Sequence, residues 1–247
     1  MDSDKETLLD FLELPLGSSD LVFEKFRYHQ RAIFREHPSD PKQRFVYIQG
    51  TLKEKVVLVA HADTFFDEHY DFPQVNHSVF EEDGWFFSNG KNAIGADNRA
   101  GCAMLYLLKD SGHSILITDG EEQRQIGSRW LMNGNKDIAG IINEHQFMIQ
   151  LDLAGASGFK CYNVGTDAFR EFIKSSTGYT EPDRESRTDI VALCRDICGV
   201  NFSTGSYGEH TQDERINIRE WENTLQMVKK ILDSKLPRFP LDKMQST

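Results

Sequence analysis

Residues 56–63 read VVLVAHAD, five apolar residues that run directly into a histidine and, two positions later, an aspartate. An unbroken apolar run of this length is typical of a strand buried on both faces of a parallel sheet. Two further runs follow the same plan: ILIT at 115–118 leads into DGEE at 119–122, and the strand predicted at 147–153 contains Asp152. Polar side chains that could bind a ligand therefore recur where buried strands end.

Helical periodicity appears between these strands. The pattern predicts helices near residues 99–109, 124–133, 167–175, 188–197 and 218–232, and two amphipathic helices in the first 33 residues, the second with an apolar stripe from Val22 to Ile33. It also predicts strands at 45–52 and 199–203, and a hairpin at 79–87 that turns at Asp83-Gly84. Alternating strands and helices indicate an α/β three-layer sandwich, a mostly parallel mixed sheet with helices on both faces. Neither a repeat nor a linker divides residues 1–247, so we expect a single domain.

The composition excludes several classes of protein. A formal net charge of −11 and a pI near 5.2 disfavour nucleic acid and anionic membranes as partners. The sequence has no apolar run of about eighteen residues that would span a membrane. The first residues lack the basic start and apolar stretch of a secretory signal, and the four cysteines are scattered in apolar contexts. We therefore expect a cytoplasmic protein with buried free thiols.

Ligands of open α/β sheets bind beyond the carboxyl ends of the strands. Five side chains fall at that edge or beside it: His61, Asp97, Glu122, Asp152 and His210. Each alone has an ordinary explanation, such as a helix cap or a surface loop residue. Together they are the imidazole and carboxylate ligands that zinc-class metals prefer. Carboxylates gathered without a cation would be forced to take up protons, so the set favours bound metal.

Five motifs carry a family resemblance: HAD at 61–63, GADNRAG at 95–101, DGEE at 119–122 with IGS at 126–128, LDLAG at 151–155 and GEHTQDE at 208–214. In this order they resemble the motifs of the zinc-dependent exopeptidase superfamily, the dizinc aminopeptidases and carboxypeptidases. The resemblance covers roughly residues 45–235. It implies a phosphorylase/hydrolase-like fold and, because no gap is long enough for a lid domain, a catalytic domain alone.

The resemblance also implies roles for the five side chains. His61 and Asp152 would hold one divalent metal ion, Glu122 and His210 would hold a second, and Asp97 would bridge the two. Zinc is the default metal, although cobalt or manganese could use the same ligands.

The remaining catalytic roles fall to two neighbours of these ligands. Glu121 would be the general base that takes a proton from water and delivers it to the leaving amine. Asp63 would orient the imidazole of His61, because residues two apart on an extended strand point the same way. The resemblance further implies a cis peptide bond between Asp97 and Asn98.

The leading hypothesis is a dizinc aminopeptidase that acts on peptides. The second is a carboxypeptidase or an N-acyl amino-acid deacylase with the same metals, which would need a cation for the substrate carboxylate. The candidates for that cation are Arg99, Arg124, Arg129 and Arg187. A catalytically inactive metal-binding or interaction domain is an alternative of another class, and a single-metal cyclotransferase, as in glutaminyl cyclases, is the last.

Two features near the predicted site have no settled role. Tyr207 lies three residues before His210 and could donate to an oxyanion, or could be a packed loop tyrosine. The aromatic and acidic loop at 64–76 could shape the substrate pocket.

Overall fold

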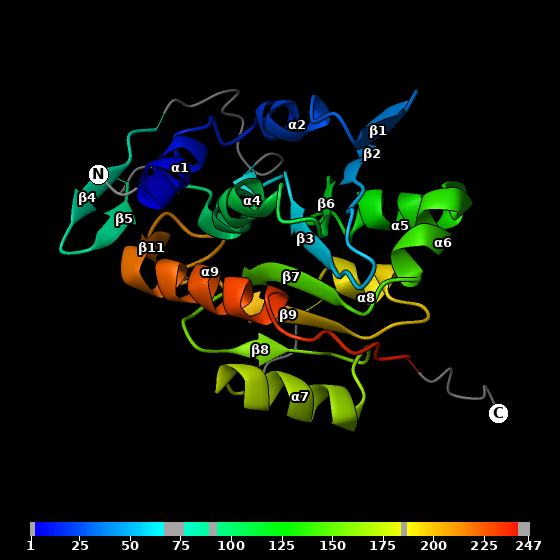
Figure 1. Ribbon diagram of the computed structural model, residues 1–247. Helices are drawn as coiled ribbons and strands as arrows, with labels where there is room; N and C mark the ends of the chain where they lie inside the picture. The colour runs from blue at the N-terminus through cyan, green and yellow to red at the C-terminus, as the bar shows by residue number, and fades with distance from the viewer. Residues whose placement is uncertain (1–2, 67–76, 89–92, 184–186, 242–247) are drawn as a thin grey trace.

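Figure 1 presents the computed structural model, which describes residues 3–66, 77–88, 93–183 and 187–241. Its main sheet has seven strands in the order β1-β2-β6-β3-β7-β9-β8. The four central strands run parallel to one another: β6 (Ser114–Thr118), β3 (Val57–His61), β7 (Met148–Leu153) and β9 (Gly199–Ser203). The flanking strands are antiparallel: β1 (Ala32–His37), β2 (Asp40–Ile48) and β8 (Phe159–Lys160). The predicted α/β fold with a mostly parallel mixed sheet is confirmed.

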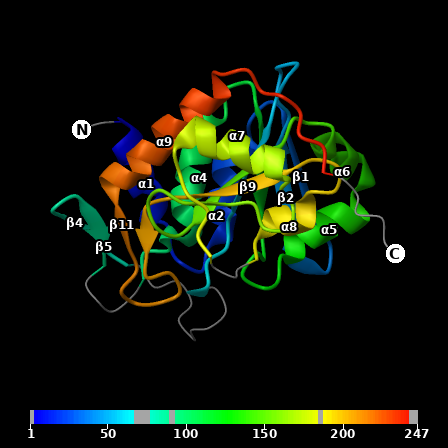
Figure 2. The ribbon, with the colours of Figure 1, turned by 90° about the horizontal axis from the view of Figure 1, so that it is seen from below.

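Helices cover both faces of this sheet (Figure 2). One face packs against α1 (Ser3–Leu12), α2 (Ser19–Arg27), α4 (Ala96–Leu108), α7 (Asp167–Thr177) and α9 (Ile218–Leu232). The other packs against α5 (Ile126–Gly134), α6 (Lys136–Asn143) and α8 (Asp189–Leu193).

The apolar run at 56–60 supplies both cores at once. Leu58 and Ala60 of β3 enter the first core, and Val57 and Val59 enter the second, with none of the four exposed. Full burial of one such Val or Leu side chain contributes about 1.5–3 kcal/mol. A strand with two buried faces favours an apolar residue at every position, which explains why the run is unbroken.

A second, four-stranded antiparallel sheet lies beside the first. Its order is β10-β11-β5-β4, with bounds Ser206–Tyr207, Arg215–Asn217, Trp85–Phe87 and Phe80–Glu82. The predicted hairpin at 79–87 forms β4 and β5. Because β10 pairs with β11 through Tyr207 and Arg215, the segment 208–214 is the loop of a second hairpin. That loop carries His210.

Some predicted boundaries were wrong. Ile33 does not extend the second helix, which ends at Arg27; Ile33 lies in β1 and pairs with Tyr47. The strand expected to reach Leu52 ends at Ile48, and the helix predicted at 188–197 is only the short α8, because the backbone becomes extended at Cys194. An apolar stripe marks a buried face, but it does not mark where the backbone changes direction.

The cysteines and the lengths of the described helices bear on the expectations from composition. All four cysteines are free and buried, as predicted. Within the described ranges, every helix is too short or too polar to cross a bilayer.

Candidate metal centre

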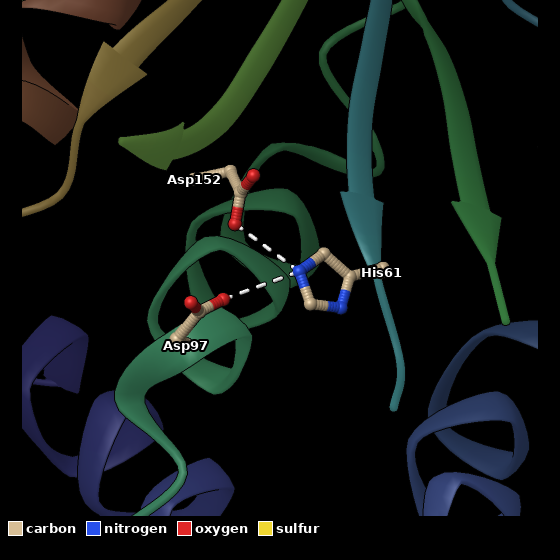
Figure 3. A group of neighbouring side chains, drawn as sticks. All are labelled: His61, Asp97 and Asp152. Atoms are coloured by element: carbon tan, nitrogen blue, oxygen red, sulfur yellow. Dashed lines mark hydrogen bonds and ion pairs between the residues drawn. The ribbon is translucent and has the colours of Figure 1, made fainter. Parts of the chain in front are cut away.

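The carboxyl ends of the parallel strands bring His61, Asp97 and Asp152 together (Figure 3). His61 Nε2, at the end of β3, lies 3.1 Å from Asp152 Oδ1 on β7 and 3.2 Å from Asp97 Oδ1 at the start of α4. The side chains of Asp97 and Asp152 are largely buried, and His61 is only 1% exposed.

A second group shares Asp97 with the first. His210 Nε2 lies 2.9 Å from Glu122 Oε1 and 3.3 Å from Asp97 Oδ2. The two oxygens of Asp97 therefore face different imidazoles, one in each group. In both groups the potential ligand atoms lie within 4.8 Å of one another. The structure thus brings all five predicted ligand residues into one cluster.

The cluster fits cations in spacing and in chemistry. Two ligands of a tetrahedral zinc ion, each about 2.0–2.2 Å from the metal, are roughly 3.3–3.6 Å apart, close to the contacts found here. Asp97 Oδ1 is buried and, beyond its ion-pair contact with His61, has no hydrogen-bond partner in the described structure. A buried carboxylate oxygen without a donor is costly, and a cation beside it would satisfy that oxygen.

The pKa values of the cluster also indicate that its carboxylates require positive charge nearby. Hydrogen bonds to Asp97 and Glu122 raise the pKa of His210 to about 10. Burial opposes ionisation of His61, but Asp152 and its neighbours outweigh burial and raise the pKa of this imidazole well above its ordinary value. Burial raises the pKa of Glu122 and of Asp152. In the absence of metal, protons thus supply the charge that divalent cations would otherwise bring.

Asp63 contacts both the imidazole of His61 and the loop that carries Glu122. Its carboxylate lies 3.3 Å from His61 Nδ1, the ring nitrogen that faces away from Asp97 and Asp152. The backbone carbonyl of Asp63 also lies 3.0 Å from the same Nδ1. The two carboxylate oxygens accept the backbone N–H groups of Glu121 and Glu122, each at 3.1 Å. Asp63 is therefore placed to orient an imidazole, as its spacing suggested, and also holds the loop after β6.

Glu121 lines the same cavity but belongs to neither ligand group. Its side chain is 9% exposed, and burial raises its pKa well above the ordinary value. Glu121 and Glu122 are adjacent in the chain but are placed for different roles. The turn after β6 allows their side chains to point in different directions.

Several supporting residues were missed in the sequence. Thr188 Oγ1 donates to Asp152 Oδ2 at 2.8 Å, and Gln150 Nε2 donates to Thr188 Oγ1 at 2.5 Å. Phe65 stacks on the ring of His210, with ring centroids 4.4 Å apart. Gln150 lies within an apolar strand, where one polar residue among buried neighbours was the available signal.

Glu214 is a further residue that was missed in the sequence. Its carboxylate, 1% exposed, accepts the backbone N–H groups of Ile94, Gly95 and Asp97 at 3.1, 2.6 and 2.9 Å. Burial raises its pKa to about 8. Because Glu214 follows His210 in the same loop, it joins that loop to the segment that carries Asp97. The peptide bond between Asp97 and Asn98 is cis, as expected.

A cavity of about 420 Å³ opens onto the cluster and is lined by four of its five members, the buried His61 being the exception. Arg124, Arg129 and Arg187 also line it, whereas Arg99 does not. Arg99 is buried and donates to the backbone carbonyl of Pro15, which removes it from the predicted carboxylate-binding candidates. Tyr207 donates to Glu220 at 2.7 Å and lines a different hollow, so it is a packed tyrosine, which lies at the end of β10 and not in a loop. Of the loop at 64–76, residues 67–76 lie outside the described structure.

Comparison with known proteins adds evidence on the fold. No protein-family model and no curated protein matches the sequence. Among solved structures, a tripeptidase from Staphylococcus aureus is similar with a TM-score of 0.69 and 14% identity, over 93% of this chain and 96% of that chain. The aminopeptidase PepT from Bacillus cereus is similar with a TM-score of 0.64 and 13% identity, over 93% and 97% of the two chains. An aminopeptidase from the archaeon Desulfurococcus kamchatkensis has a TM-score of 0.63 and 12% identity, over 94% and 96%. The predicted resemblance is therefore confirmed at the level of the fold: this chain has the fold of the zinc exopeptidases.

Proposed function

We propose that this chain is a metal-dependent hydrolase that cleaves an amide bond, with two divalent metal ions, zinc by default, as cofactors. One observation carries the proposal: a carboxylate shared between two imidazole–carboxylate groups lies in a cavity that also contains a separate buried glutamate. His61 and Asp152 would hold one ion, Glu122 and His210 the other, and Asp97 both. When bound, the ions supply Lewis acidity that polarises the scissile carbonyl and acidifies water.

The chain's own groups supply the proton transfers. Glu121 is buried, so its carboxylate has a raised pKa and accepts a proton readily when water attacks. The same carboxylic acid then delivers that proton to the departing amine. Asp63 fixes the backbone of Glu121 through a 3.1 Å hydrogen bond, which limits how far the base can move from the reacting water.

Aminopeptidase action on peptides is the first choice within this class. The solved structures that share the fold include two aminopeptidases and a tripeptidase. A carboxypeptidase or an N-acyl amino-acid deacylase is the second candidate, and three arginines in the cavity wall favour a substrate with a carboxylate.

The decisive variant is Glu121→Gln, which keeps the side-chain shape and removes the base. We expect turnover to fall by about 10²- to 10⁴-fold, measured on aminoacyl, peptidyl and N-acyl amide substrates with and without chelator. Elemental analysis should find nearly unchanged metal content. Glu171→Gln, an exposed change on α7, is the matched control. Unchanged turnover would remove Glu121 from its role, and absence of turnover in the wild-type protein would leave a metal-binding domain.

Asp97→Ala tests the shared ligand separately. Because each oxygen of Asp97 faces one group, its removal should release both ions together. Full retention of one ion by the Asp97→Ala protein would contradict the bridging role.

A further inference from the structure

Three arginines in the wall of the cavity stand out in a chain with a formal net charge of −11. Arg124, Arg129 and Arg187 are all exposed residues, so their guanidinium groups can reach a ligand in the cavity. The guanidinium group is the side chain best matched to a carboxylate, which it can bind through two parallel hydrogen bonds.

Local contacts hold the guanidinium of one of these arginines, Arg129, in position. Arg129 Nε donates to the backbone carbonyl of Arg124 at 2.9 Å, and Arg129 Nη2 donates to Gln125 Oε1 at 3.4 Å. These contacts occupy one edge of the guanidinium and leave Nη1 on the other edge. Arg124 and Gln125 both have left-handed backbone conformations, with φ of 67° and 58°. Such conformations are uncommon outside glycine and cost free energy, and they often mark ligand-binding segments.

The start of α5 does not itself provide free donors for an anion. The N–H groups of Gln125, Ile126 and Gly127 donate to the carbonyls of residues 121, 120 and 119, at 2.8–2.9 Å. An anion at this wall of the cavity would therefore be bound by the arginine side chains.

Both arginine-bearing segments are attached to the candidate metal centre. Arg124 follows Glu122 by two residues, and Arg187 precedes Thr188, whose hydroxyl donates to Asp152 at 2.8 Å. A carboxylate bound by these arginines would thus lie in the same cavity as an amide placed at the centre.

A buried amide in the same cavity needs a further partner. Asn201 lines the cavity, is 1% exposed and donates through Nδ2 to Tyr162 Oη at 3.2 Å. Its Oδ1 is buried and has no hydrogen-bond partner in the described structure. An unpaired buried acceptor is costly, and a substrate N–H group would satisfy it.

We propose that the substrate carries a free carboxylate close to the scissile amide, bound by Arg124, Arg129 and Arg187, and an N–H group that donates to Asn201. Short peptides with a free carboxyl terminus and N-acyl amino acids share this chemistry. A cavity of about 420 Å³ is within the range that accommodates small ligands. The proposal rests on the proposed amide hydrolysis for the position of the scissile bond.

The test compares each substrate with its carboxyl-terminal amide, using a tripeptide, a dipeptide and an N-acetyl amino acid. The metal-loaded enzyme should have a kcat/KM about 10- to 100-fold higher for the free acids, as expected for loss of a charge-assisted contact. Arg124→Ala, Arg129→Ala and Arg187→Ala should each reduce this preference mainly by acting on the free acid. Arg195→Ala, an exposed change outside the cavity, should leave it unchanged. Lysine at the same three positions should restore part of the preference.

Equal kcat/KM for the acids and the amides would overturn the proposal, as would a preference that survives all three alanine changes in variants whose thermal unfolding is unaltered. The relative rates on the peptides and the N-acetyl amino acid identify which carboxylate source is used. If no amide is cleaved, the proposed function fails, and calorimetric titration of the metal-loaded Glu121→Gln protein with N-acetyl amino acid and its amide still tests the arginines. Equal affinity for the two would then refute the carboxylate site on its own.

Discussion

At the scale of single residues, the site depends on how one carboxylate is shared. Asp97 faces His61 with one oxygen and His210 with the other, although the two histidines are 149 positions apart in the chain. Burial raises the pKa of Asp97, but its contacts with the imidazoles of His210 and His61 outweigh burial and lower that pKa. Asp97 therefore remains an anion, the state required of a ligand that serves two cations.

Asp63→Ala should weaken metal binding without removing any ligand. The change would leave His61 Nδ1 with only a backbone carbonyl and the N–H groups of Glu121 and Glu122 without their acceptors. Loss of such an orienting partner typically lowers metal affinity about 10- to 100-fold. Titration of the metal-free protein with zinc measures the effect. Asp110→Ala, on the surface, is the control, and equal zinc affinity of the two variants would contradict the orienting role.

The sequence was sufficient to predict which residues meet, but it could not reveal what holds them. His61, Glu122 and Asp152 follow or end buried strands, so the carboxyl edge of the sheet brings them together. The contacts of Glu214 with residues 94–97 span about 120 positions, and no local pattern encodes them. The assignment of His61, Glu122 and Asp152 as metal ligands stays a prediction until metal is measured.

At the scale of the elements, α4 must lie very close to β7 to present Asp97. A Cβ atom on Gly101 would lie 2.0 Å from the carbonyl oxygen of Leu151 and 2.2 Å from Asn98 Oδ1. Glycine is thus required in the middle of the helix, where its lower helical propensity is accepted for the sake of packing. The close approach fixes both the helix and the ligand at its start.

Gly101→Ala should destabilise the protein by about 1–3 kcal/mol or more, because the helix must shift away from the strand. Gly140→Ala is the matched control, since Gly140 is exposed on α6 and a Cβ there would have no neighbour within 4 Å. That change should stabilise the protein by about 0.5–1 kcal/mol through helix propensity. Urea unfolding measures both. Similar effects of the two changes would show that α4 is not packed as described.

His145 connects α6 to β6 and should make stability dependent on pH. Its Nδ1 donates to the carbonyl of Ile141 at 2.9 Å, and its Nε2 lies 2.8 Å from Ser114 Oγ, which suits a neutral ring. Burial lowers the pKa of His145 from 6.5 to about 4. The unfolded chain therefore binds the proton first as the pH falls, so stability is lost between pH 6.5 and pH 4.

The free energy of unfolding of the metal-free protein should fall by about 2 kcal/mol from this residue between pH 7 and pH 5. His145→Gln should remove that part of the slope in urea unfolding experiments. An equally steep slope in the His145→Gln protein would assign the pH dependence to other groups.

The central strands could be predicted because they are buried on both faces, whereas several short or peripheral strands could not. The strands β3, β6, β7 and β9 and the helix α9 agree with the expected positions to within a residue or two. The two-residue strands β8 and β10 have too little sequence for a pattern, and Ile33 of β1 was assigned to the preceding helix because it is apolar and continues the stripe that begins at Val22.

At the scale of the whole molecule, the candidate ligands come from five segments that the chain visits between residues 61 and 210. These segments are the end of β3, the start of α4, the loop after β6, the strand β7 and the hairpin loop between β10 and β11. Cations at the cluster would therefore join the main sheet to the small one. That the chain forms one catalytic domain stays a prediction, and a single cooperative unfolding transition would support it.

Metal binding should accordingly raise the thermal stability of the entire fold. A metal present at 100 times its Kd stabilises the native state by about 2.7 kcal/mol. For a domain of this size that corresponds to a rise in Tm of roughly 5–10 °C, which a chelator should reverse. Asp97→Ala should abolish the difference between the metal-loaded and chelated samples, while Asp110→Ala should retain it. If zinc binds by elemental analysis but leaves the Tm of the wild-type protein unchanged, the ions are held by one local segment and not by the cluster that joins the two sheets.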